Sequence, residues 1–368
     1  MLVPDRDAVI DRIETRCYEV PTDRPESDGT FAWDSTTIVV VYAHCGPETG
    51  LGYTYGPRAV ASVIADLLTG VACGFDALAP ARAWEAMHAA LRNAGQGGIG
   101  AMALSALDVA LHDLRARLLG VALVRAIDGV RDDVAVYGSG GFTTYGPAEV
   151  AEQLAGWAAA GIPRVKMKVA REPQADPERL AAARAAIGAD TELMVDANGA
   201  FTAEHAVAWA ERYREYDVRY LEEPVSQDDL AGLRHVREHA PPGMAIASGE
   251  YTWGRYDTVR LIAAEAVDIV QADVTRCGGL TELARIDALC GAHGRPLSLH
   301  CAPAIGAHAG CALDQFAHLE YFHDHVCIEG MLFDGVPPLR GGVLTPDPTR
   351  PGHGLELKDA DAERFRVS

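Results

Sequence analysis

Short apolar runs and longer amphipathic segments alternate strictly along the chain from residue 134 onwards. The apolar runs are rich in Val, Ile and Leu and are bounded by turn residues, which is typical of parallel strands buried on both faces. Segments with apolar residues at helical spacing lie between them, for example 147–160, 177–187 and 203–216. The predicted strands are 134–138, 164–169, 192–196, 218–222, 245–250, 268–273, 296–300 and 318–321. Eight alternating units of this kind predict an α/β protein with a (β/α)8-type barrel, a modified TIM barrel.

The first 130 residues show a different order, in which strands come first and helices follow. Alternating or β-branched segments predict three antiparallel strands, at 8–20, 36–43 and 50–55, and the polar residues 21–30 predict a loop. Helical spacing predicts three helices, at 58–70, 80–93 and 100–119. This order indicates a separate α+β domain. We therefore divide the chain into an α+β domain, 1–130, and a barrel, 131–339, and expect the tail, 340–368, to pack back on the first domain.

Ionisable side chains stand at the C-terminal ends of seven successive predicted strands. A strand interior cannot solvate a charge, and the C-terminal ends of barrel strands converge on one face. Taken singly, each position also fits a plainer interpretation, such as an edge-strand lysine, an Asx turn or a charged loop. Seven in succession, spaced by about one strand–helix unit, indicate one shared polar site. Its predicted members are Lys168, Asp196, Glu222, Glu250, Asp273, His300 and Glu320.

Three of these residues, Asp196, Glu222 and Glu250, are hard oxygen ligands. Three converging carboxylates repel one another unless a cation lies between them, and Mg²⁺ suits them while keeping open positions for substrate oxygens. No cysteine or histidine accompanies them on the same strands, which disfavours zinc. We therefore predict one Mg²⁺ ion per site.

Two further groups are candidate bases on different sides of this site. Lys168 shares a strand face with Lys166, and that lysine and the metal would both depress the pKa of Lys168 towards neutrality. His300 lies on a strand nearly opposite and would reach the other face of a bound substrate. Asp273 on the adjacent strand would hold His300 in one tautomer and raise its basicity.

Composition narrows the class of partner. The formal net charge of −20 and a pI near 5.0 argue against nucleic acid and anionic membranes as partners. Eight scattered cysteines without a C-x-x-C pair indicate reduced thiols. Neither a leader-like segment nor an apolar run of about 18 residues is present. We expect a cytoplasmic protein that acts on a small molecule.

Six motifs in this chain resemble those of the enolase superfamily, and within it the mandelate racemase subgroup. They are Lys166-Met167-Lys168, Asp196-Ala197-Asn198, Glu222-Glu223-Pro224, Gly249-Glu250, Asp273 and His300. The resemblance covers essentially the whole chain and implies that the first domain caps the barrel. It implies that Asp196, Glu222 and Glu250 bind the Mg²⁺ that holds a substrate carboxylate. Lys168 would then move the proton on the adjacent carbon, and His300, oriented by Asp273, would act from the opposite face. Substrate contacts are implied for Lys166, Asn198 and Glu320. Capped barrels often associate, so a homo-oligomer is expected.

Two bases on opposite faces permit either dehydration of an acid sugar or racemisation and epimerisation of a carboxylic acid. Segments 21–33 and 50–56 of the cap are more polar than a pocket for an aromatic ring requires, which favours a polyhydroxy acid and hence the dehydratase. A barrel that only binds a metal or sugar acid is the alternative from another class, and retention of both bases argues against it. His323-Asp324-His325 follows the last strand, where a loop with surface histidines is favoured over a second metal site.

Overall fold

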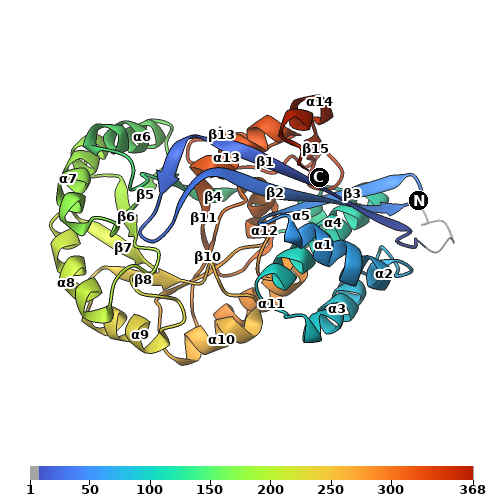
Figure 1. Cartoon of the computed structure of the whole chain (residues 1–368), viewed down its shortest axis with the longest axis horizontal. Helices are drawn as coiled ribbons and strands as arrows, with labels where there is room; N and C mark the ends of the chain where they lie inside the picture. The colour runs from blue at the N-terminus through green and yellow to red at the C-terminus, as the bar shows by residue number, and fades with distance from the viewer. Residues whose placement is uncertain (1–7, 368) are drawn as a thin grey trace.

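Eight parallel strands close into a barrel in the computed structural model, which describes residues 8–367 (Figure 1). The strands follow one another in chain order around the barrel, and pairing of β11 with β4 closes it. They are β4 (Val134–Gly140), β5 (Arg164–Lys168), β6 (Glu192–Asp196), β7 (Val218–Glu222), β8 (Ala245–Ser248), β9 (Ile269–Ala272), β10 (Leu297–Leu299) and β11 (Phe316–Phe322). The predicted fold class is confirmed.

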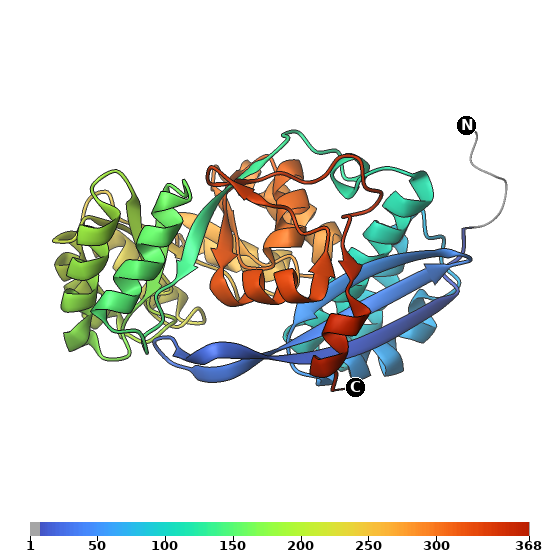
Figure 2. The ribbon, with the colours of Figure 1, turned by 90° about the horizontal axis from the view of Figure 1, so that it is seen from above.

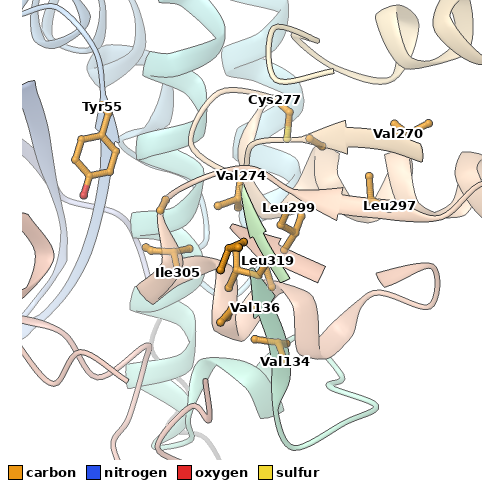
Figure 3. Close-up of a cluster of buried hydrophobic side chains, with 14 of the residues drawn as sticks. Tyr55, Val134, Val136, Val270, Val274, Cys277, Leu297, Leu299, Ile305 and Leu319 are labelled. Atoms are coloured by element: carbon orange, nitrogen blue, oxygen red, sulfur yellow. The ribbon is translucent and has the colours of Figure 1, made fainter. Parts of the chain in front are cut away.

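Helices surround the barrel and cover the outward faces of its strands. They are α6 (Pro147–Ala159), α7 (Asp176–Ile187), α8 (Ala203–Arg214), α9 (Leu230–His239), α10 (Arg255–Ala263), α11 (Gly279–Ala292), α12 (Pro303–Ala312) and α13 (His323–Leu332). Figure 3 shows the resulting core, in which strand residues such as Val136, Leu299 and Leu319 gather near Ile305 of α12. Alternation along each strand turns the other side chains inward, where Tyr137 and Tyr220 fill the barrel.

The N-terminal part is an antiparallel sheet backed by helices. Its strands are β1 (Arg12–Ser27), β2 (Ala32–Cys45) and β3 (Glu48–Tyr55), in that spatial order. Its helices are α1 (Ala59–Val63), the π-helical turn η1 (Ile64–Leu68), α2 (Thr69–Ala72), α3 (Pro80–Ala90), α4 (Ile99–Leu119) and α5 (Leu123–Ala126). The α4 helix packs so closely on β3 that a Cβ atom at Gly50 would lie 2.2 Å from the carbonyl oxygen of Ala110. Only glycine fits at this position.

The β1–β2 hairpin reaches across the mouth of the barrel (Figures 1 and 2). The loop predicted at 21–30 is therefore wrong for residues 21–27, since strand pairing resumes at Glu26↔Trp33 after an irregularity that begins at Pro21, whereas residues 28–30 form the turn of the hairpin. Prolines are tolerated here because β1 is an edge strand. At the hairpin tip, a Cβ atom on Gly29 would lie 2.3 Å from Ala197 O, so the tip lies directly on the loop after β6.

The C-terminal tail contacts both parts of the molecule. Its short strands are β12 (Phe333–Asp334), β13 (Leu339–Arg340), β14 (Val343–Leu344) and β15 (Glu356–Leu357), and β14 extends the barrel sheet beside β4. The helix α14 (Asp359–Ala362) then lies near β1, where Arg16 and Asp359 are 2.7 Å apart. Among residues 8–367, no helix is both long enough and apolar enough to cross a membrane.

Candidate active site

The three predicted metal ligands meet at the C-terminal mouth of the barrel. Asp196 and Glu222 end the paired strands β6 and β7 at the same register, and Glu250 follows β8 by two residues. Each is buried, and together they offer oxygen atoms that all lie within 4.8 Å of one another. The structure therefore brings together three carboxylates that are 26 and 28 residues apart in the chain.

Unusual backbone conformations hold these carboxylates in place. Gly249 has φ +138°, and a Cβ atom there would lie 2.2 Å from the carbonyl oxygen of Gln271. Only glycine therefore allows the strand end to approach β9 and aim Glu250 into the barrel. Asn198 and Glu223 have φ values of 45° and 38°, so the chain turns sharply after Asp196 and Glu222. Such strained positions are typical of functional sites.

Lys166 and Lys168 extend from β5 into the same acidic cluster. The Lys166 Nζ lies 2.6 Å from Glu222 Oε1 and 2.9 Å from Glu320 Oε1. The Lys168 Nζ lies 2.5 Å from Asp196 Oδ2. Burial lowers the pKa of Lys168, but the carboxylates of Asp196, Glu250 and Glu320 together raise it above its usual value. The sequence predicts a lowered pKa for Lys168. This pKa can fall only if a cation offsets the negative charge of these carboxylates.

His300, from the end of β10, approaches the cluster from another side of the barrel. Its Nδ1 lies 2.8 Å from Asp273 Oδ2, and its Nε2 lies 3.1 Å from Glu250 Oε2. Asp273 is itself fixed by Thr275, whose backbone N–H and hydroxyl both donate to Oδ1 at 2.7 Å. Burial alone lowers the pKa of His300, but Cys301 and the carboxylates of Glu250 and Glu320 raise it well above its usual value.

The two remaining predicted residues also line this site. Glu320, from β11, accepts a hydrogen bond of 3.1 Å from the backbone N–H of Cys301, in addition to its pairing with Lys166. The backbone N–H of Asn198 donates to Asp196 Oδ1 at 2.9 Å, and its side-chain oxygen is buried without a partner among residues 8–367. All nine predicted site residues are thus neighbours, although their individual roles stay predictions.

The site opens into a cavity of about 470 Å³ between the barrel and the hairpin. Lys168, Asn198, Glu250, His300 and Glu320 line its barrel side. Cap residues line the other side, among them Phe31, Trp33, Thr37, Tyr55 and Gly56. The N-terminal domain therefore completes the cavity, as its expected capping position implies.

The expectation of a loop with surface histidines at 323–325 is wrong. These residues form the first turn of α13, and Asp324 and His325 are buried beside the cavity. The Trp33 indole Nε1 donates to Asp324 Oδ2 at 2.9 Å, and the His325 ring stacks on Tyr55 with centroids 3.4 Å apart. Because α13 begins directly after β11, its first turn lies at the barrel mouth. Sequence reasoning also missed Arg276, which lines the cavity three residues after Asp273.

The carboxylate cluster fits a hard divalent cation. The Glu222 Oε2 atom is buried without a hydrogen-bond partner among the described residues. Burial raises the pKa of Glu222 to about 8, and the neighbouring carboxylate of Asp196 contributes to this increase. An all-carboxylate donor set with such an uncompensated oxygen is suited to Mg²⁺.

Comparison with known proteins places this geometry in a family. Residues 149–362 match the family described as enolase C-terminal domain-like. A mandelate racemase/muconate lactonizing enzyme-like protein from Rubrobacter xylanophilus has 56% identity and a TM-score of 0.96, with 97% of this chain and 99% of that one covered. The 3,6-anhydro-alpha-L-galactonate cycloisomerase of Streptomyces coelicolor is 32% identical, with 97% of this chain and 98% of the relative covered.

A third similar protein is the L-talarate/galactarate dehydratase of Salmonella typhimurium LT2, whose solved structure contains Mg and L-lyxarohydroxamate. It is 25% identical with a TM-score of 0.89, covering 100% of this chain and 95% of that one. The barrel, the cap and these matches define an enzyme of the enolase superfamily. Within it, the chain belongs to the mandelate racemase/muconate lactonizing enzyme group.

Proposed function

We propose that this enzyme removes the proton next to the carboxylate of an acid sugar and eliminates water from the neighbouring carbon. The observation that carries the proposal is the pair of buried bases, Lys168 and His300, flanking three carboxylates whose oxygens lie within 4.8 Å of one another. A binding protein would need the carboxylates for a cation but neither base.

Asp196, Glu222 and Glu250 would hold Mg²⁺. When bound, the ion supplies a Lewis acid that fixes the substrate carboxylate and offsets the charge that develops on it. Cation binding also explains how the two bases become available. Lys168 and His300 now pair with Asp196 and Glu250 at 2.5 and 3.1 Å, and a cation that satisfies these carboxylates leaves both bases free to contact the substrate.

Each base has a geometrically distinct role. Lys168 Nζ, on β5, is positioned to take the proton from the carbon next to the carboxylate. His300 Nε2, on β10, is positioned to protonate a leaving hydroxyl from the opposite face, since its Nδ1 is held by Asp273 at 2.8 Å. Lys166 and Glu320, which are 2.9 Å apart, would neutralise and hydrogen-bond the carboxylate oxygens. Asn198 would position the substrate from the loop after β6.

Cycloisomerisation of an acid sugar is a second candidate, favoured by the match to the Streptomyces coelicolor cycloisomerase over 97% of this chain. It shares proton transfer next to a carboxylate but releases no water, because the leaving oxygen belongs to a ring. Racemisation or epimerisation, the alternative drawn from the sequence, would return the proton to the opposite face. All three outcomes use the same two bases.

The experiment is a screen of mono- and diacid sugars and their lactones with Mg²⁺. A keto-acid assay detects dehydration, and proton NMR in D₂O detects exchange of the proton next to the carboxylate and ring opening. We expect keto acid with release of water from at least one acid sugar. Ring opening without water release would replace the dehydratase by a cycloisomerase, and exchange alone would replace it by a racemase or epimerase. If no acid sugar gives keto acid, ring opening or exchange of the proton next to the carboxylate, the proposal is overturned.

A further inference from the structure

The side chain of Arg276 lies in the wall of the active-site cavity and has no hydrogen-bond partner among residues 8–367. It follows β9 and lines the cavity that also holds Lys168 and His300. Its guanidinium donates no hydrogen bond to any residue between 8 and 367, and the Nε atom is buried without an acceptor. By contrast, the buried guanidinium of Arg179 donates to the carbonyl oxygens of Gly141 and Phe142, at 2.8 and 2.9 Å.

The nearest carboxylate does not satisfy this guanidinium. Asp273 Oδ2 lies 3.5 Å from Arg276 Nε, outside good hydrogen-bond geometry, and the same oxygen is already 2.8 Å from His300 Nδ1. The guanidinium instead lies over the Tyr251 ring, with 5.6 Å from its central carbon to the ring centroid, a distance typical of a cation–π contact. This cation–π contact does not use the N–H groups of the guanidinium, which therefore stay free for a ligand.

His325, which lines the same cavity, contributes a second donor that has no acceptor among residues 8–367. The backbone N–H of Ala302 donates to His325 Nδ1 at 3.3 Å, so the neutral ring carries its proton on Nε2. Burial and the nearby charge of His300 lower the pKa of His325 to about 3, which keeps the ring neutral. The ring cannot rotate freely, because it stacks on Tyr55 at 3.4 Å.

A guanidinium that donates no hydrogen bond among the described residues and a fixed imidazole donor together suit a negatively charged ligand group with several acceptor oxygens. The metal site and Lys166 already account for one carboxylate. We propose that Arg276, assisted by His325, binds a second carboxylate at the far end of the substrate, so that the preferred substrates are sugar diacids rather than monoacids. This inference rests on the proposed function, because it names the substrate class of the same site.

The test compares a hexaric acid with the hexonic acid of the same configuration, which has a CH₂OH group in place of the second carboxylate. The screen of acid sugars described above identifies the sugar configuration on which the enzyme acts, and both test acids have that configuration. In the wild-type enzyme we expect a KM for the diacid about 10- to 100-fold below that for the monoacid, as befits hydrogen bonds to a charged group. Arg276→Met should raise the diacid KM by about the same factor and leave the monoacid KM within about twofold.

Two further variants separate recognition from structure. Arg212 also lies over an aromatic ring, 4.5 Å from the centroid of Trp209, but outside the cavity, so Arg212→Met is the matched control and should leave both KM values unchanged. His325→Phe retains an aromatic ring for Tyr55 but removes the donor, and should raise only the diacid KM. Equal KM values for the two acids in the wild type, or an equal effect of Arg276→Met on both, would overturn the inference.

A binding measurement keeps this inference separate from the proposed reaction. Calorimetry with Mg²⁺-loaded His300→Asn, which is expected to bind without turnover, should show tighter binding of the diacid than of the monoacid. Adding Arg276→Met should abolish that difference. If no acid sugar reacts with the wild type yet this difference is present, the proposed reaction fails and the diacid site stands. If the difference is absent, the diacid site fails whatever the reaction.

Discussion

The indole Nε1 of Trp33 donates a 2.9 Å hydrogen bond to Asp324 Oδ2, which joins the cap hairpin to the first turn of α13. The two residues lie 291 positions apart in the sequence. Their contact lies at the edge of the cavity, where both residues contribute to its lining. It holds the hairpin over the barrel mouth, and closure of this kind excludes water from a site that develops charge.

We expect Trp33→Phe to loosen the hairpin. The variant leaves Asp324 buried without its donor, which should cost about 1–3 kcal/mol of unfolding free energy and raise KM more than it lowers kcat. Asp324→Asn retains an acceptor for the indole and serves as the conservative control. Hydrogen exchange over residues 21–33 reports the opening directly. Unchanged exchange in Trp33→Phe would show that this contact does not hold the hairpin.

Removal of either base should abolish turnover. Lys168→Ala and His300→Asn each delete a group that moves a proton, and such groups contribute about 10²- to 10⁴-fold to rate. Melting temperature and circular dichroism should show a retained fold. Because the two groups serve opposite faces, α-proton exchange in D₂O should be lost in Lys168→Ala and can persist in His300→Asn. Full activity in both variants would refute the site assignment.

Metal dependence should follow from the carboxylate cluster. We expect a chelator to abolish activity and Mg²⁺ to restore it, and Glu250→Ala to weaken Mg²⁺ binding measured by calorimetry. Glu215→Ala, which removes an exposed carboxylate without an ion-pair partner among the described residues, is the matched control. An unchanged Mg²⁺ affinity in Glu250→Ala would remove this residue from the ligand set.

Glu329 should make stability fall as pH rises. Burial raises the pKa of Glu329 to about 8, although the Tyr53 hydroxyl and the Ala304 N–H both donate to it. The folded state therefore binds this proton more tightly than the unfolded state does. The associated stability is complete below the ordinary pKa near 4.5 and is lost as pH rises through about 8.

Glu329→Gln removes this titration while keeping an amide that can serve both neighbours. We therefore expect the gap in unfolding free energy between variant and wild type to shift in favour of the variant between pH 5 and pH 9. The scale is about 1.4 kcal/mol per pKa unit. Urea unfolding at several pH values measures the gap. A gap independent of pH would show that Glu329 does not titrate in this window. Burial also raises the pKa of Glu26, to about 9. Glu26 is present in the wild type and in the variant, so its contribution to the pH dependence cancels in the difference between their unfolding free energies.

The barrel and its charged strand ends were predictable because both are periodic. Parallel strands repeat a local pattern, and Lys168, Asp196 and Glu222 occupy the same place in successive units. The hairpin was not predictable, since the polar residues and prolines of 21–30 match a loop and only contact with the barrel makes Glu26 and Ser27 buried strand residues. Likewise, nothing local to His325 indicates that it faces Tyr55, because that contact depends on how the cap docks.

The separation of Trp33 from Asp324 also has a consequence for how the polypeptide is made. The hairpin leaves the ribosome early, but its partner on α13 is synthesised 291 residues later. A nascent chain of the first 300 residues contains the hairpin and the loop after β6 beneath its tip, but it lacks Asp324, the hydrogen-bond partner of Trp33. The edge strand β1 is then held by fewer contacts, and loosely held edge strands invite aggregation. Contacts that join such distant residues form slowly. We expect release of the full-length chain, rather than emergence of the cap, to determine when the active site first closes.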